Sequence, residues 1–210
     1  YAIMLKNIGG DDMITVAKDN SGDYTSLQQA VNSVPFGIPE TIYIKNGIYK
    51  ERVEIRQDNI TLIGESKDNV IVTEGYYARM LMPDGSKRGT FRSYTFLVYA
   101  DNFSAYNITF ENSAGFGDDV GQAIAVYAEG DNIIFKNCKL LGHQDTLFTG
   151  PLPMKEKQPG GFTGPTINAK RRHVHQLYED CYIAGEVDFI FGSATAYFRN
   201  CTLFALNRNN

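Results

Sequence analysis

Two aspartates are candidates for chemistry because each follows a cysteine at the same distance. Asp145 lies seven residues after Cys138, and Asp188 lies seven residues after Cys181. If the two cysteines occupy equivalent places in neighbouring structural repeats, the two carboxylates lie together on one face. Such a pair can divide nucleophilic and general acid–base work between its members. Either aspartate alone is more typical of a turn residue, so the shared phase is what favours a catalytic interpretation.

A recurring segment, in which asparagine flanks an apolar trio, supports the idea of repeats. Copies lie at 59–64, 107–112, 132–138, 176–181 and 196–201. Phe110 and Phe135 are 25 residues apart and the last two cysteines are 20 apart, which are spacings typical of solenoid repeats. The 43 residues from Cys138 to Cys181 predict one coil plus an insertion, and we assign the insertion to the Pro- and Gly-rich segment 150–172.

The local patterns predict an all-β protein with a single short helix. A helix is expected within residues 23–35, with Thr25 and Gln28 forming a capping box and Pro35 ending it. Short strand-like runs follow at 41–44, 53–55, 60–63 and 70–72, separated by Gly, Asn and Asp. Strands stacked as coils of a parallel β-helix explain the repeats, and asparagine suits the bends because it tolerates left-handed backbone.

Other hydrolase chemistries find less support in the chain. No Gly-x-Ser-x-Gly elbow occurs, and two of the three histidines, His173 and His175, lie beside the insertion. The three cysteines occupy repeating positions, where small packing residues are expected. The glycine-rich segment 115–121 has the wrong spacing for a dinucleotide loop, so we interpret it as a turn before a strand.

Composition restricts the partners of the chain. Its 210 residues suit one domain, which we place at 13–210, with 1–12 as leader or vector residues. A net charge of -4 gives no overall attraction to nucleic acid, and no run approaches the roughly 20 apolar residues of a membrane helix. The basic cluster 170–172 is either a solvated loop or a contact for a polyanionic substrate. We therefore expect no nucleic acid and no membrane partner.

Two longer motifs give the chain a family resemblance. Segments 142–148 (GHQDTLF) and 182–192 (YIAGEVDFIFG) resemble the two signature motifs of pectin methylesterases. Shorter matching segments lie at 23–26, 47–49 and 108–112, and the resemblance covers nearly all of 13–204. It implies a right-handed parallel β-helix (solenoid) with a short N-terminal capping helix. It also implies hydrolysis of methyl esters on the galacturonate units of pectin, with release of methanol.

The resemblance implies a role for each matching residue. Asp188 corresponds to the nucleophile, Asp145 to the general acid/base and Gln144 to the amide that stabilises the oxyanion. Gln122 and Thr90 correspond to substrate-binding residues, and Gln122 also helps to hold the oxyanion. No cofactor and no metal are implied. The expected partner is methyl-esterified homogalacturonan, bound by a monomer, and this polymer favours a secreted or periplasmic location although no signal peptide is visible.

The chain departs from the family pattern in ways that keep alternatives open. It has no Trp and no Leu-Gly-Arg-Pro-Trp-like segment, whose arginine orients the nucleophile, and neither Arg199 nor Arg208 matches it. We therefore expect a domain incomplete at the C-terminus and weak or inactive by itself, and the alternative is a non-catalytic or degenerate pectin-binding β-helix. Pectate lyases and polygalacturonases share the solenoid. A lyase needs calcium ligands and a basic catalytic residue, and a polygalacturonase needs a cluster of aspartates. The two motifs of this chain fit neither requirement.

The resemblance carries two further expectations. The insertion at 150–172 is longer than in plant members and resembles the bacterial subgroup. Some bacterial relatives bridge the pair that corresponds to Cys181 and Cys201, so a disulfide is an option here. Coils stack about 4.8 Å apart, which lies within the Cα separation that a disulfide allows.

Overall fold

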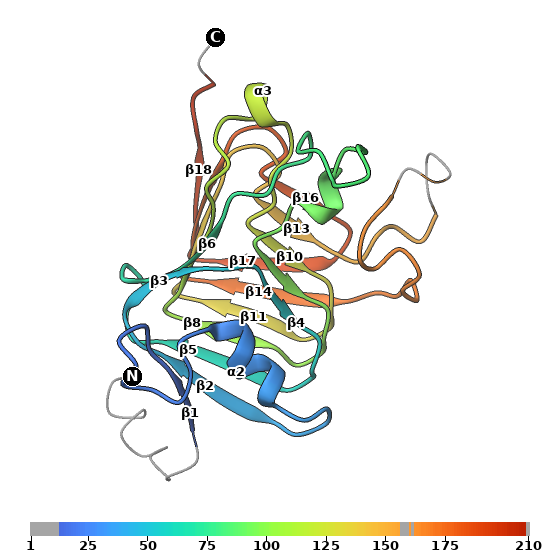
Figure 1. Cartoon of the computed structure of the whole chain (residues 1–210). Helices are drawn as coiled ribbons and strands as arrows, with labels where there is room; N and C mark the ends of the chain where they lie inside the picture. The colour runs from blue at the N-terminus through green and yellow to red at the C-terminus, as the bar shows by residue number, and fades with distance from the viewer. Residues whose placement is uncertain (1–12, 156–159, 161, 209–210) are drawn as a thin grey trace.

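The strands of this chain stack as the coils of a solenoid. The computed structural model describes residues 13–155, 160 and 162–208, and within them the strands form three parallel sheets around one core (Figure 1). Each full coil contributes one strand to each sheet. The predicted all-β parallel β-helix is confirmed, whereas the expected leader or vector segment 1–12 lies outside the described residues.

The three sheets are named A, B and C. Sheet A contains β1 (Ile14–Val16), β2 (Glu40–Ile44), β5 (Ile60–Gly64), β8 (Ser104–Tyr106), β11 (Ile133–Lys136), β14 (His175–Glu179) and β17 (Thr195–Arg199). Sheet B contains β3 (Gly47–Lys50), β6 (Val70–Glu74), β9 (Thr109–Asn112), β12 (Lys139–Leu141), β15 (Tyr182–Gly185) and β18 (Thr202–Ala205). Sheet C contains β4 (Val53–Ile55), β7 (Phe96–Val98), β10 (Val126–Ala128), β13 (Leu147–Thr149) and β16 (Ile190–Gly192). The helical elements in the described residues are α2 (Leu27–Ser33), η1 (Thr90–Arg92) and α3 (Gly117–Val120).

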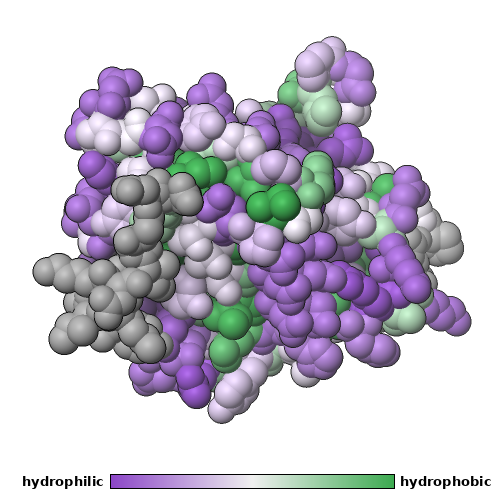
Figure 2. Space-filling view, turned by 90° about the horizontal axis from the view of Figure 1, so that it is seen from below, coloured by the Kyte–Doolittle hydropathy of each residue, from purple (hydrophilic) through white to green (hydrophobic). Residues whose placement is uncertain are grey.

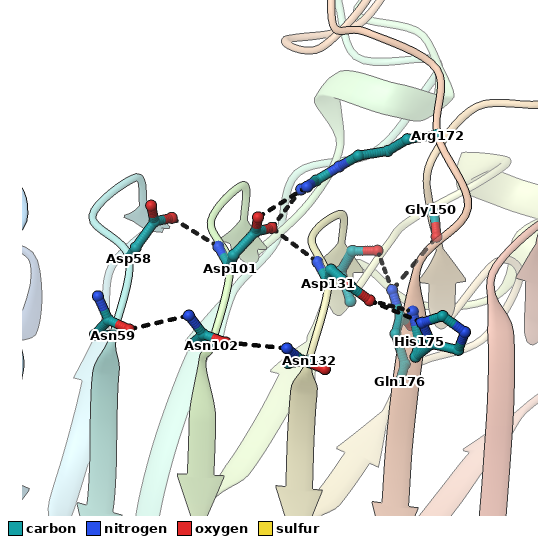
Figure 3. A network of polar contacts seen from close by, with 11 residues as sticks. Asp58, Asn59, Asp101, Asn102, Asp131, Asn132, Gly150, Arg172, His175 and Gln176 are labelled. Carbon is teal, nitrogen blue, oxygen red and sulfur yellow. Dashed lines mark hydrogen bonds and ion pairs between the residues drawn. The ribbon is translucent and has the colours of Figure 1, made fainter.

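Left-handed residues make the bends between the strands, as the asparagine pattern predicts. Asn59, Asn102 and Asn132 have φ of 63°, 55° and 57° at the corner before sheet A. Their side chains also form a ladder, because Asn102 donates to Asn59 at 3.0 Å and Asn132 donates to Asn102 at 3.1 Å (Figure 3). One residue type thus supplies both the backbone turn and a bond between coils.

One predicted repeat is wrong in its alignment. The segment beginning at Asn107 does not stack on the segment beginning at Asn132. Asn107 instead accepts a hydrogen bond from Asn137 at 2.7 Å, at the corner before sheet B. The true coil step here is 30 residues, from Ser104 to Ile134. Each coil has two corners with the same asparagine-apolar pattern, so the pattern alone does not tell one corner from the other.

Coil length varies because two coils carry long insertions, one between β6 and β7 and the other between β13 and β14. The step from Thr41 to Thr61 is 20 residues, but that from Thr61 to Ser104 is 43. The second long coil, from Ile134 to Leu177, also takes 43 residues and carries the predicted insertion, which projects from the solenoid (Figure 1). The sequence prediction missed the earlier insertion, which contains η1.

The predicted N-terminal helix forms as the shorter α2, at the end of the solenoid beside β1 and β2 (Figure 1). Its cap is Ser26 and not Thr25, and the Ser26 side chain accepts from the backbone N–H of Gln29. Glu51 accepts the N–H groups of Leu27 and Gln28 at 3.0 Å each, which satisfies donors that a helix start leaves open. Glu51, which directly follows β3, therefore takes the place of the Gln28 side chain that the predicted capping box would have used.

The surface at this end of the molecule is mixed. Hydrophilic residues predominate, and the hydrophobic ones form small separate patches (Figure 2). None of the helices in the described part of the chain is long and apolar enough to cross a membrane.

Aromatic side chains stack inside the coils. Phe135 lies parallel to Tyr178 with ring centroids 5.5 Å apart, and Tyr178 lies over Phe198 at 4.8 Å. Phe135 and Tyr178 are fully buried. Burial of a large apolar side chain contributes about 1.5–3 kcal/mol to folding, so this row of rings stabilises the packing of each coil on the next.

The cysteines form an inward-facing row of free thiols. The disulfide between Cys181 and Cys201 that the resemblance offered is absent, because Cys138, Cys181 and Cys201 are all unpaired. Each sulfur faces a carbonyl of the preceding coil; Cys181 Sγ lies 3.4 Å from Phe135 O and Cys201 Sγ lies 3.3 Å from Tyr178 O. Burial raises the pKa of the Cys138 thiol, which keeps it in the unreactive form. The packing interpretation of the cysteines is the one that fits.

A second ladder, formed by aspartates, runs beside the asparagine ladder at the corner before sheet A. Asp58 accepts from the backbone N–H of Asp101, Asp101 accepts from that of Asp131, and Asp131 accepts from that of His175 (Figure 3). Arg172 forms a two-pronged ion pair with Asp101. The basic cluster 170–172 therefore contributes at least one side chain to the structure of the corner.

We predict that Asp101→Asn makes the protein less stable at neutral pH and less sensitive to acid. Arg172 is the main cause of the lowered pKa of Asp101, so the carboxylate stabilises the fold above its unfolded pKa of about 3.9. That contribution disappears as pH falls through the lower folded pKa. Chemical unfolding between pH 2.5 and 7 measures it. Asp58→Asn is the matched control, because Asp58 has no cation partner among the described residues, and an equal pH dependence in both variants would contradict the prediction.

Candidate active site

Asp145 and Asp188 occupy the same position in neighbouring coils, each two residues before a strand of sheet C. Leu147 pairs with Ile190 across β13 and β16, and the N–H of Asp145 donates to Val187 O at 3.1 Å. Both aspartates have left-handed backbone, with φ of 66° and 51°. Aspartate tolerates this region better than most residues. The structure therefore brings together the two carboxylates that the cysteine spacing predicted to be neighbours.

The two carboxylates lie in different surroundings. Asp145 is buried, with 5% of its surface exposed, whereas Asp188 is exposed. Burial, and after it the charge of Asp188, raises the pKa of Asp145 to about 7. Both effects disfavour the ionised form of Asp145. A carboxyl group that titrates near neutral pH can give a proton in one step and take it back in another.

Two glutamines lie next to Asp145 along the chain or in the coil stack. Gln144 directly precedes Asp145, and Gln122 belongs to the preceding coil, where the N–H of Ala123 donates to Gln144 O at 3.0 Å. Both glutamines are half-buried. Within the described residues, neither amide and neither carboxylate side chain forms a hydrogen bond with the protein. The two amides thus have no protein partner among these residues.

Thr90 lies in the insertion between β6 and β7. It begins η1, and its neighbour Gly89 donates to Ala78 O at 2.9 Å. Ala78 in turn donates to Gln122 O at 2.8 Å. Backbone hydrogen bonds therefore link the turn before Thr90 to Gln122 through Ala78. Among the described residues, Thr90 forms no hydrogen bond with Asp145 or Asp188.

A largely buried aromatic cluster, missed by the sequence analysis, packs on the outer face of sheet C, where Tyr127 and Phe148 are buried and Phe91, Phe162 and Phe191 are half-buried. Phe148 and Phe191 each follow a site aspartate by three residues, and their rings are 5.0 Å apart. Tyr127 continues the row at 4.6 Å from Phe148. Phe91 and Phe162 pack edge-on from the two insertions. The signal was present, because both signature motifs place an aromatic residue three positions after aspartate.

The cation that the resemblance assigns to the nucleophile is not supplied by the last coil. Arg199 pairs with Glu179 and Arg208 pairs with Asp118, each at 2.5 Å. In the part of the chain that the structure describes, no basic side chain contacts Asp188. The same residues contain no group of three or more His, Cys, Asp or Glu side chains arranged to hold a metal ion.

The chain matches one protein family over most of its length. The pectinesterase family model matches residues 13–152 and 168–210. Pectinesterase 31 of Arabidopsis thaliana is 36% identical over 197 residues, which cover 90% of this chain and 55% of that protein. Pectinesterase/pectinesterase inhibitor PPE8B of Prunus persica is 37% identical over 194 residues, covering 90% of this chain and 31% of that protein. The chain thus spans about half, or less, of the length of these relatives.

Solved structures of similar fold agree with these matches. Pectin methylesterase PemA from Erwinia chrysanthemi has a TM-score of 0.79 at 32% identity, covering 96% of this chain and 57% of that chain. Pectin methylesterase from carrot has a TM-score of 0.75 at 31% identity, covering 94% and 53%. A pectin methylesterase mutant solved in complex with a hexasaccharide also has a TM-score of 0.79, at 32% identity and with coverage of 96% and 57%.

We predict that Asp188→Asn lowers the pKa of Asp145 from about 7 without returning it to the ordinary value of 3.8. The substitution removes the like charge and leaves burial, the larger cause, in place. Carbon NMR of the Asp145 carboxyl group measures the titration directly. Asp58→Asn, at the opposite edge of sheet C, serves as the control and is expected to leave it unchanged. A native Asp145 that titrates near pH 4 would contradict the prediction.

Proposed function

Because the chain belongs to the pectinesterase family, we propose that it removes methyl esters from the galacturonate units of pectin, with Asp188 as the nucleophile. The observation that carries this proposal is the pair of carboxylates in equivalent coil positions. One is exposed, and the other is buried with its pKa raised to about 7. Environments that separate two carboxyl groups in this way favour different chemical roles for them.

The first half of the proposed reaction forms an acyl-enzyme. A carboxylate oxygen of Asp188 attacks the ester carbonyl carbon and gives a tetrahedral intermediate. The N–H groups of Gln144 and Gln122 donate to its oxyanion, and loss of one such donor typically lowers kcat about 10²–10³-fold. Asp145 gives its proton to the methoxy oxygen as the carbon–oxygen bond breaks. Methanol leaves, and an anhydride joins Asp188 to the substrate.

The second half regenerates both aspartates. Asp145, now ionised, takes a proton from a water molecule whose oxygen attacks the substrate carbonyl carbon of the anhydride. The bond to Asp188 breaks, the galacturonate acid is released and Asp188 is again a carboxylate. Asp145 ends with the proton that it started with. A pKa near 7 suits this alternation because neither form of Asp145 is strongly disfavoured at neutral pH.

The surface around the pair supports a sugar substrate. Phe191 follows Asp188 by three residues and is half-buried, so it offers apolar surface on which a sugar ring can pack, and the two glutamines supply polar contacts. We assign Gln122 to both substrate and oxyanion binding. Thr90 is assigned to substrate binding only, which is the role that the family resemblance implies.

A pectin-binding module without turnover is the second candidate. The observation that favours it is the lack of a cation on Asp188 among the described residues. An unassisted Asp188 has fewer contacts to hold its orientation for attack. This candidate predicts retention of pectin by the protein together with no methanol release, so one pair of assays separates the two functions.

We predict that Asp188→Ala in the full-length protein lowers methanol release from highly methyl-esterified pectin about 10⁴-fold or more, the scale of loss seen when a nucleophile is removed. Asp180→Ala is the matched control, because Asp180 lies in the same coil with a similar left-handed φ of 55°. It is expected to retain turnover. Wild-type turnover in Asp188→Ala would exclude the nucleophile assignment. Pectin binding without turnover by the wild type would establish the binding module instead.

We also predict a pH dependence set by Asp145. The first step needs Asp145 protonated, so kcat is expected to fall as pH rises through about 7. Initial rates of methanol release between pH 5 and 9 measure this limb, and Asp145→Asn is expected to abolish it together with most of the activity. A rate that stays constant to pH 9 would contradict the acid role of Asp145.

A further inference from the structure

Glu186 is a buried acidic residue two positions before Asp188. Its side chain is only 1% exposed. One carboxylate oxygen lies 2.8 Å from His143 Nδ1, and the other accepts from the backbone N–H of Gly117 at 3.3 Å. Arg208 Nε lies 3.9 Å from the second oxygen. A buried carboxylate is costly unless its surroundings satisfy it, so these three contacts together hold the group in place.

The two hydrogen-bonded partners of Glu186 confine Gln144 from two sides. His143 directly precedes Gln144 in the turn before β13. Gly117 begins α3 and packs against the glutamine so closely that a Cβ atom at Gly117 would lie 2.7 Å from both Gln144 Cβ and Gln144 Oε1. Phe116 adds a ring contact with His143, at 4.5 Å between centroids. Glu186 therefore links the two groups that limit where the Gln144 amide can lie.

We propose that Glu186 is a positioning residue that holds the Gln144 amide at the oxyanion through its bonds to His143 and Gly117. The inference rests on the proposed function, in which Gln144 stabilises the oxyanion. A carboxylate has two acceptor oxygens and serves both N–H donors at once. A glutamine of the same size has one acceptor oxygen and an NH₂ group, so one of the two donors loses its partner.

The activity test is a double-mutant cycle in the full-length protein. Glu186→Gln is expected to lower kcat about tenfold with KM within twofold, and Gln144→Ala is expected to lower kcat 10²–10³-fold. In the Gln144→Ala background, Glu186→Gln is expected to change kcat less than twofold, because the group that it positions is gone. Glu179→Gln, a largely buried glutamate paired with Lys136 and Arg199 on a distant face, is the matched control and is expected to keep wild-type kcat.

Two kinetic outcomes would overturn the proposal. One is a loss of equal size with and without Gln144, which would mean that Glu186 acts on the whole fold or through another group. The other is a wild-type kcat in Glu186→Gln. If Glu186→Gln does not fold, His143→Gln enters the same cycle, because it breaks the same connection from its other end, and the same non-additivity is expected.

A second readout does not depend on turnover. The side-chain NH₂ resonances of Gln144 are expected to shift and broaden in Glu186→Gln, while those of Gln122 stay unchanged and serve as the internal control. Unchanged Gln144 resonances would overturn the positioning role. A Gln144 response in a protein that releases no methanol would confirm the positioning role and reject the proposed function, so the two failures are distinguishable.

Discussion

Backbone pairing between coils is the constraint on which the rest of the structure depends. Each strand in the three sheets bonds to the strand of the next coil in parallel register, so residues at equivalent positions stack directly on one another. The interior rings, the thiols and the asparagines of the corners all follow this rule. The site follows it too, because the carboxylates of Asp145 and Asp188 lie together only through the pairing of β13 with β16.

Equal backbone geometry does not give the two aspartates equal chemistry. Both have left-handed φ at the same corner, yet only Asp145 is covered by chain on both sides. Asp188 precedes β16, the outermost described strand of sheet C, and remains open to solvent. Register therefore sets where the two carboxylates are, and the depth of Asp145 in the stack raises its pKa.

The sequence predicted most of the repeating features, and it missed side-chain contacts that follow no period. The cysteine spacing gave the correct stacking of the two aspartates, because equal offsets along paired coils are preserved in space. The asparagine pattern predicted left-handed corners, but it aligned Asn107 with the wrong corner, since both corners have the same composition. The link from Glu186 to His143 and Gly117 had no signal in one sequence, because it joins three coils through side chains that follow no period. The sequence also named Thr25 and not Ser26 as the helix cap, because the contacts of Glu51 with Ser26 and the helix start form only in the fold.

The corner ladder of Asp58, Asp101 and Asp131 keeps the stacked corner positions independent of the length of chain between them (Figure 3). Each carboxylate meets the next coil at a fixed place, whereas the chain between corners takes 20, 30 or 43 residues. Insertions can therefore lengthen during evolution without shifting the stacked positions. The two long insertions contact each other through Phe91 and Phe162, so their lengths can change while Asp145 and Asp188 keep their places in the stack.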